Sequence, residues 1–284
     1  MRAKAEGLIV QARRDFHAAL LAGPLTVSAN GVPAIADAAN KKSIRLAQAL
    51  VEGVGAAKTK AKVAGQQSGD EFEDAVLVFL RATFLALPHL RPGNWTVEKG
   101  GGQVSRFEQL AHLAELARFL GEHPGLKAAM PVEYFITPDV VVSRAPEPDE
   151  VINHPRVIAD ASTAVHSPLR RQNNPLPLLH ATISCKWTIR SDRVQNTRTE
   201  AQNLIRNRNG RVPHIVAVTA EPLPSRIGAI AQGTADLDCV YHFALPELIA
   251  AHTSLGYDED DFLKSLVDAK RLRDISDLPL DLAI

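Results

Sequence analysis

The chain has little cysteine, few aromatic residues and no excess of charge of either sign. Its 2 cysteines in 284 residues are too few for a disulfide framework or a zinc cluster, which favours a reducing, cytoplasmic location. Its 32 basic residues balance 32 acidic ones, which argues against a nucleic-acid coat protein that binds through overall positive charge. No apolar run reaches membrane-spanning length, and the N-terminus lacks a signal-peptide pattern. We therefore expect no membrane contact.

One segment departs from this balance of charge. Residues 186–211 carry seven basic side chains against two acidic ones. Such a concentrated basic segment in a neutral protein is typical of a local contact with phosphate groups, which sets affinity but not sequence preference. The candidates for such contacts are Arg198, Arg206, Arg208 and Arg211.

The apolar periodicity predicts an α/β protein with a mixed central β-sheet flanked by helices. Helices are expected at 1–22, 41–57, 70–87, 106–121, 192–207, 225–232 and from 246, and strands at 95–98, 132–144, 178–187, 214–220 and 239–245. Residues 145–177 contain six prolines and little periodicity, so we expect a long surface loop. With no repeat or linker, residues 1–284 are interpreted as one domain, with a helical part at about 1–125 and a catalytic core at about 130–250.

Two residues near the ends of neighbouring predicted strands suit phosphodiester chemistry. The carboxylate of Asp139 could hold a hard divalent cation, and the ammonium of Lys186 could stabilise the nucleophile or the developing negative charge. Mg²⁺ is the expected ion, because it takes few protein carboxylates and completes its shell with water and phosphate oxygens. The main-chain carbonyl of Cys185 is a further candidate ligand.

One carboxylate is too few for such a site. Ser184 occupies the position, two residues before Lys186, where a second acid is often found. Glu200 is the best replacement, because it lies seven residues, about two turns, beyond Arg193 and therefore on the same face of a predicted helix. Glu73 is a second candidate, although three neighbouring acids compete with it on sequence alone, namely Asp70, Glu71 and Asp74.

A charged cluster opens the same predicted helix. Arg190, Ser191, Asp192 and Arg193 lie where a helix N-terminus could enter a major groove. Arginine matches guanine with two hydrogen bonds and aspartate can accept from cytosine, so the cluster suits a G·C-rich site. Taken singly, a strand aspartate, a surface glutamate and a charged helix start are ordinary features. Their combination is what indicates a nuclease.

The residues of these motifs resemble those of a known family. Pro138-Asp139, the run from Ser184 to Arg193, and Glu200 are similar to the NgoMIV-type restriction endonucleases, which belong to the PD-(D/E)XK nuclease superfamily and cut around a CCGG core. The resemblance extends over nearly the whole chain. It includes the segments at 65–73, 91–95, 213–216, 238–245 and 274–282.

The resemblance implies a type II restriction endonuclease with a restriction-endonuclease-like fold, which leaves a 5′ overhang without a covalent enzyme intermediate. Two Mg²⁺ ions per active site would be held by Asp139, the Cys185 carbonyl, Glu200 and Glu73, while Lys186 serves the attacking water. Glu200 would replace the acid missing at Ser184, and the choice of Glu73 over its acidic neighbours rests on the resemblance.

The resemblance also assigns recognition and assembly. Arg190, Asp192 and Arg193 would read the inner CCGG, Gln66 would contact the minor groove, and Asp37 would read the outer pair of GCCGGC. Ala39 departs from the family pattern, which has a hydroxyl side chain there. The implied assembly is a homotetramer of two dimers that binds two copies of duplex DNA, paired functionally with a cognate DNA methyltransferase. The alternatives are a structure-selective repair nuclease of the same fold and a catalytically inactive DNA-binding module.

Overall fold

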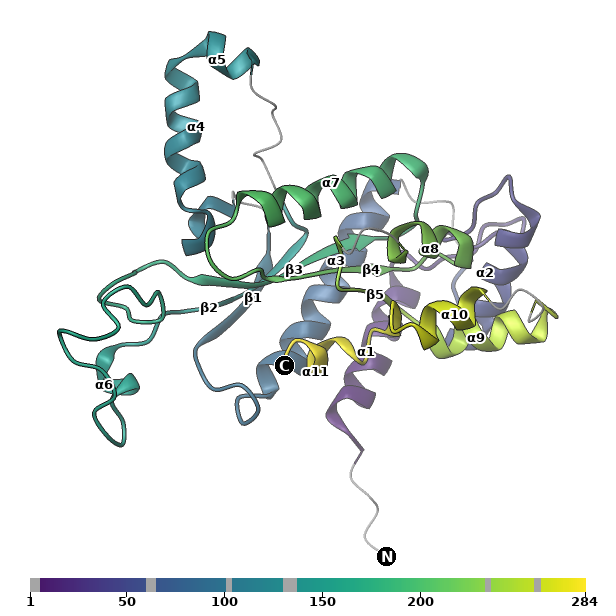
Figure 1. Cartoon of the computed structure of the whole chain (residues 1–284). Helices are drawn as coiled ribbons and strands as arrows, with labels where there is room; N and C mark the ends of the chain where they lie inside the picture. The colour runs from purple at the N-terminus through teal and green to yellow at the C-terminus, as the bar shows by residue number, and fades with distance from the viewer. Residues whose placement is uncertain (1–5, 60–64, 101–103, 130–136, 233–235, 258–261) are drawn as a thin grey trace, which may run out of the picture.

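A mixed six-stranded sheet organises the computed structural model (Figure 1), which describes residues 6–59, 65–100, 104–129, 137–232, 236–257 and 262–284. The strands lie in sequence order: β1 (Trp95–Lys99), β2 (Val140–Arg144), β3 (Leu178–Lys186), β4 (His214–Thr219), β5 (Cys239–His242) and β6 (Leu272–Asp274). The β1–β2 and β2–β3 pairs are antiparallel, and the three later pairs are parallel. The predicted α/β class with a mixed sheet is confirmed.

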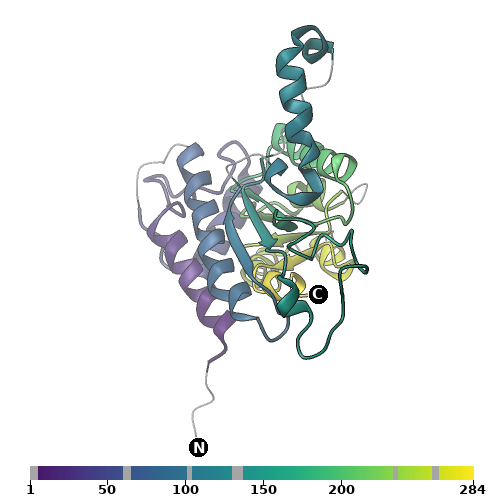
Figure 2. The ribbon, with the colours of Figure 1, turned by 90° about the vertical axis from the view of Figure 1, so that its left-hand side faces the viewer.

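Helices cover both faces of this sheet. Figure 2 shows α1 and α3 on one side of the strands and α7 on the other, while α4 and α5 project away from the body. The helices are α1 (Leu8–Ala22), α2 (Lys41–Val54), α3 (Gly65–Thr83), α4 (His112–Glu122), α5 (Pro124–Ala129), α6 (Asp149–Ile152), α7 (Ser191–Asn207), α8 (Pro224–Ala231), α9 (Leu245–Ser254), α10 (Phe262–Asp268) and α11 (Leu278–Asp281). Three short 3-10 turns accompany them: η1 (Phe84–Ala86), η2 (Val104–Arg106) and η3 (Glu108–Leu110).

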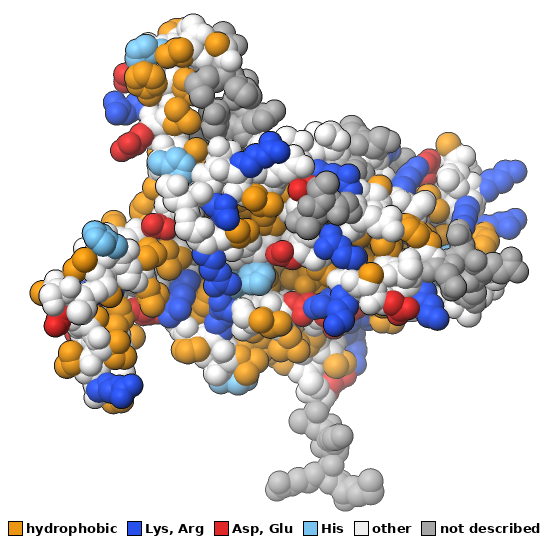
Figure 3. Space-filling view, viewed as in Figure 1, with side chains coloured by type: hydrophobic (Ala, Val, Ile, Leu, Met, Phe, Trp, Pro, Cys, Tyr) orange, Lys and Arg blue, Asp and Glu red, His pale blue; other side chains and the backbone are white. Residues whose placement is uncertain are grey.

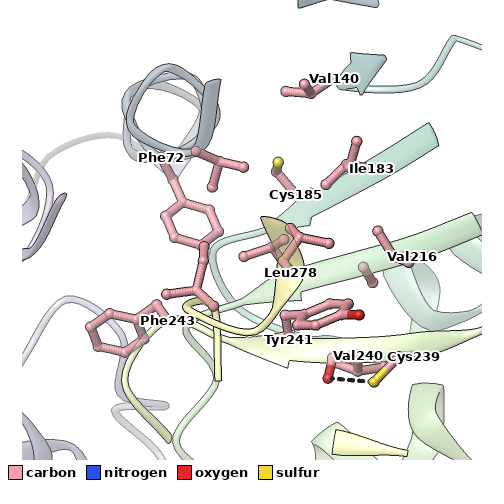
Figure 4. Close-up of a cluster of buried hydrophobic side chains, with 14 of the residues drawn as sticks. Phe72, Val140, Ile183, Cys185, Val216, Cys239, Val240, Tyr241, Phe243 and Leu278 are labelled. Carbon is pink, nitrogen blue, oxygen red and sulfur yellow. Dashed lines mark hydrogen bonds between the residues drawn. The ribbon is translucent and has the colours of Figure 1, made fainter. Parts of the chain in front are cut away.

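The central strands are apolar nearly throughout because neither face meets water. Ala181, Ile183, Ala217 and Val218 are each fully buried, as expected of strands covered by helices on both sides. Figure 4 shows Phe72 reaching from α3 toward the strands that carry these residues. One cluster of buried apolar side chains extends from α1 to α11 and sets the distance between the helices and the sheet.

The strand predicted at 132–144 is shorter than expected. β2 begins at Val140, and residues 137–139 precede it. The earlier part of the prediction, at 132–136, lies outside the described residues. Pro138 therefore removes no ladder hydrogen bond, and β2 is an interior strand between β1 and β3. A proline in this predicted strand favours an edge position or a bulge. The edge position is wrong, whereas β2 does have a shift in register between Val142 and Ser143.

Three helix starts also differ from the prediction. α1, expected over 1–22, begins at Leu8. The helix expected at 70–87, which Ser68 or Asp70 was predicted to cap, begins at Gly65 as α3, so both residues lie inside it. The polar first turn of α3 has no apolar periodicity by which the sequence could have revealed it. The helix expected at 106–121 begins at His112 as α4, after the turns η2 and η3.

The predicted long loop is built around one buried arginine. Residues 145–177 contain only the short helix α6, and most of their side chains are exposed. Arg170 is an exception, at 2% exposure. Its guanidinium binds the carboxylate of Asp149 and the carbonyls of Asp160 and Thr163. These bonds give a surface loop a fixed shape.

Candidate active site

The structure brings Asp139 and Lys186 into direct contact. β2 runs antiparallel to β3, so the residue before the start of β2 lies beside the end of β3. Asp139 Oδ2 accepts a hydrogen bond from the main-chain N–H of Cys185 at 2.6 Å and lies 3.1 Å from Lys186 Nζ. Both side chains are partly exposed, Asp139 at 22% and Lys186 at 17%. The pair is thus fixed from the protein side and open to a ligand.

A glycine allows the chain to approach this aspartate. The N–H of Gly100 donates to the carbonyl of Asp139 at 2.9 Å. A Cβ added at Gly100 would lie 1.6 Å from the carbonyl oxygen of Pro138. No other residue type fits this position without moving Pro138, and Asp139 would move with it.

Glu73 approaches the same point from α3. The neighbouring Phe72 ring packs on Trp187, the residue after the lysine, with ring centroids 5.3 Å apart. Burial, together with the negative charge of Asp139, raises the pKa of Glu73 to about 7. A carboxyl perturbed by burial and by a second carboxylate is typical of a functional site.

Glu200 approaches from the other face, on α7. Burial, aided by Asp139 and opposed by Lys186, raises its pKa. Glu200 and Ser184 line one small cavity of about 20 Å³, together with Pro138. The hydroxyl Oγ of Ser184 is buried there with no hydrogen-bond partner in the described part of the chain. A cavity of this size has room for about one water molecule, which could satisfy that hydroxyl.

The available donors suit a hard cation. Among the described residues, no three side chains of the His, Cys, Asp or Glu type converge to hold a metal ion by themselves. Mg²⁺ requires less than that, because it is usually held by one or two carboxylates and keeps its waters. The Cys185 thiol is not a suitable ligand, because burial raises its pKa well above the usual range and keeps it neutral. Carboxylate and carbonyl oxygens remain as the donors.

The predicted reading residues open α7, as expected. Arg190 is exposed at the N-cap. Ser191, Asp192 and Arg193 form the first turn, and their side chains lie outside the described part of the structure. Glu200 follows on the same helix, so the geometry joins the reading segment to one candidate acid.

The structure adds Arg226, a residue that the sequence did not single out. Arg226 of α8 forms an ion pair with Asp37, in the loop before α2. The hydrogen bond from Arg226 lowers the pKa of Asp37, and the charge of Arg190 adds to this effect. Arg226 lies 189 residues from Asp37 in the chain, so no local signal could have paired them. Gln66 is exposed in the first turn of α3.

Comparisons with known proteins identify the family of this chain. The family model described as NgoMIV restriction enzyme matches residues 16–284. The chain is 47% identical over 283 residues to the type II restriction enzyme NgoMIV of Neisseria gonorrhoeae, covering 98% of this chain and 99% of that one. The chain belongs to the NgoMIV restriction enzyme family. It is a type II restriction endonuclease, which sets aside the repair nuclease and the inactive DNA-binding module.

On the surface of this restriction enzyme, basic side chains are interspersed with acidic and apolar ones. Figure 3 shows Lys and Arg side chains among apolar and acidic ones on one face of the molecule. Of the arginines predicted to contact phosphate, Arg206 and Arg211 are exposed, while Arg198 and Arg208 donate to main-chain carbonyls. No helix in the described part of the chain has the length and apolar character needed to cross a membrane.

Proposed function

We propose that this restriction enzyme hydrolyses both strands of GCCGGC in duplex DNA, uses Mg²⁺, and leaves a 5′ overhang. The contact of Asp139 with the Cys185 N–H and with Lys186 carries the catalytic part of the proposal. The recognition part is supported by the place of Arg190 at the start of the helix that also bears Glu200. Site reading and chemistry would therefore share α7.

In the proposed reaction, each residue has a separate task. Asp139, with the Cys185 carbonyl, Glu200 and Glu73, would hold two Mg²⁺ ions, which when bound would neutralise charge on the scissile phosphate. Asp139 also holds the ammonium of Lys186 in place, and that ammonium orients the attacking water by hydrogen bonding. Ser184 faces the cavity beside Glu200, where its hydroxyl would bind an ordered water. No side chain would form a covalent bond to the DNA.

Recognition would divide between inner and outer base pairs. Arg190, Asp192 and Arg193 would read the inner CCGG, and Gln66 would contact the minor groove. We propose that Asp37 reads the outer pair together with Arg226, because the two side chains are in contact and an arginine–aspartate pair matches G·C.

Although Ala39 lacks the hydroxyl side chain of the family, it still supports the proposed outer reader Asp37. Its main-chain N–H donates to Asp37 Oδ1 at 3.1 Å, so the backbone holds the carboxylate although the hydroxyl side chain of the family is missing. Arg226→Ala should therefore reduce discrimination at the outer pair by about tenfold or more and leave discrimination within CCGG unchanged. Cleavage rates on duplexes altered at either position would show this. Equal losses at both positions would exclude an outer-pair role for Arg226.

The symmetry of the proposed target supports a dimer, and the family resemblance implies the tetramer. A palindromic site is read by two copies of a chain related by a two-fold axis, and we propose a homotetramer of two such dimers that binds two DNA copies. We also propose one domain over residues 1–284, a cytoplasmic location, in keeping with two free and buried cysteines, and a cognate methyltransferase that protects host DNA. Sedimentation of the protein with and without duplex DNA would test the tetramer.

One experiment tests the core of the proposal. Mixed genomic DNA is digested with the enzyme and Mg²⁺, and the fragment ends are sequenced. Discrete fragments whose ends all derive from GCCGGC, with the same 5′ overhang, are expected. Ends with another outer pair would correct the site, and a smear without a common end sequence would refute site-specific cutting.

A further inference from the structure

A buried glutamate lies behind the reading residues. Glu221 follows β4 and is 1% exposed. Its Oε2 accepts from the main-chain N–H of Ile189 at 2.9 Å, and its Oε1 accepts from the N–H of Leu223 at 3.1 Å. The guanidinium of Arg226 lies 3.8 Å from Oε2. A carboxylate is costly to bury unless such partners are present, so its presence needs an explanation.

The partners of this carboxylate lead to both proposed readers. Ile189 immediately precedes Arg190, so its bond to Glu221 fixes the backbone from which the first inner reader extends. Arg226 holds Asp37, so the same carboxylate also orients the outer pair of reading groups. One buried side chain thus connects two segments that are distant in sequence.

The main chain of Glu221 leads to the catalytic lysine. Its N–H donates to the hydroxyl of Thr219 at 3.1 Å, and that hydroxyl donates to the carbonyl of Lys186 at 2.8 Å. Thr219 is 1% exposed, so water does not compete for these bonds. The end of β3, the start of α7 and α8 are therefore held by one short network.

We propose that Glu221 is a positioning residue for sequence discrimination, which holds the inner reader Arg190 and the outer readers Arg226 and Asp37 in one geometry. This inference rests on the proposed function. Glu221 itself touches no DNA in this proposal and acts through Ile189 and Arg226.

The variant Glu221→Gln removes the charge and keeps the shape. Glutamine has one acceptor oxygen, so it can satisfy either Ile189 or Leu223 but not both, and its amide N–H group would face the donors of Arg226. Glu247→Gln is the matched control. Glu247 is a glutamate at 19% exposure that also pairs with an arginine, Arg13, but it belongs to a cluster without predicted site residues.

The ionisation of Glu221 provides a second test that needs no variant. Burial raises the pKa of Glu221 to about 7. Asp37 faces it through Arg226, and the hydrogen bond from Arg226 lowers the pKa of Asp37, so that carboxyl stays ionised between pH 6 and 8. His242 contacts the Glu221 carbonyl, and burial lowers its pKa to about 4. Glu221 is therefore the group of this set that titrates in the window.

The experiment measures kcat/KM on duplexes containing GCCGGC and ACCGGT for the wild type and both variants at pH 8, and for the wild type from pH 6 to 8. The measured quantity is the kcat/KM for GCCGGC divided by that for ACCGGT. We expect Glu221→Gln to lower this ratio by at least about tenfold, the factor that one arginine–guanine pair contributes, while Glu247→Gln leaves it unchanged. The wild-type ratio should rise with pH through about 7. A change in the protonation of the catalytic acids alters both rates and cancels in the ratio.

Two results would overturn the inference. One is a wild-type ratio that is high and constant with pH; the other is a ratio that both variants leave unchanged or lower equally. If Glu221→Gln does not fold, the wild-type pH profile decides alone. Failure of the proposed function is seen separately, because the wild type would then cut GCCGGC no better than ACCGGT, and the inference would fall with it.

Discussion

Replacing Asp139 by asparagine should separate cleavage from binding. The asparagine Oδ1 can still accept from the Cys185 N–H, which Asp139 bonds at 2.6 Å. A hydrogen bond to a charged acceptor contributes about 1.5–3 kcal/mol and one between neutral groups about 0.5–1.5 kcal/mol. The exposed side of the site is screened by water. We therefore expect the free energy of unfolding to fall by only about 1–2 kcal/mol, too little to unfold the protein.

The loss of activity should be much larger. Metal-ion stabilisation of a phosphoryl group contributes several kcal/mol, and about 4 kcal/mol corresponds to roughly a thousandfold in rate. Asp139→Asn should therefore reduce Mg²⁺-dependent cleavage of a GCCGGC duplex at least about a thousandfold, with specific binding, measured without metal, largely kept.

Asp281→Asn is the control for this change. The Asp281 carboxylate is 22% exposed and pairs with Arg273, so it matches Asp139 in burial and in having a basic partner but lies outside the predicted site. It should leave cleavage unchanged. An Asp139→Asn variant that cuts within tenfold of the wild type would refute the assignment of Asp139 as a metal-holding carboxylate.

Three further changes have defined outcomes. Because the pKa of Glu73 is about 7, apparent Mg²⁺ affinity should increase about tenfold per pH unit below pH 7 and level off above it; Glu73→Gln should flatten this profile in a metal titration. Gly100→Ala, whose Cβ would collide with the Pro138 carbonyl, should lower both the melting temperature and cleavage by displacing Asp139, and unchanged activity would show that the chain adjusts elsewhere. The folded-state pKa of Glu221, about 7, lies above its ordinary 4.5, so the stability linked to its proton is present at acid pH and lost as pH rises through 7. Glu221→Gln should therefore gain up to about 3 kcal/mol of unfolding free energy relative to the wild type between pH 5 and pH 8, measured by denaturant titration; a gap that does not change with pH would contradict the burial of a titrating carboxyl.

The sequence was informative wherever a structural feature depends on neighbouring residues. The apolar runs at 178–187 and 214–220 predicted β3 and β4 to within one residue, because strands buried on both faces have few alternatives to apolar side chains. The charged cluster at 190–193 also marked the start of α7, since polar and charged side chains are common where a helix begins. The motif around Lys186 identified the family, and the comparisons confirmed it.

Tertiary structure decided what depends on distant segments. The contact of Asp139 with Lys186 required β2 and β3 to pair antiparallel, and no periodicity specifies which strands become neighbours. The burial of Glu221 and its link to Arg226 arise only when β4, α8 and the start of α7 pack together. The sequence by itself determined which residues could bind metal and DNA, because each residue type has its own functional groups. Only the fold decided which of them meet and how deeply each carboxyl is buried, because both depend on packing between parts of the chain that are far apart in sequence.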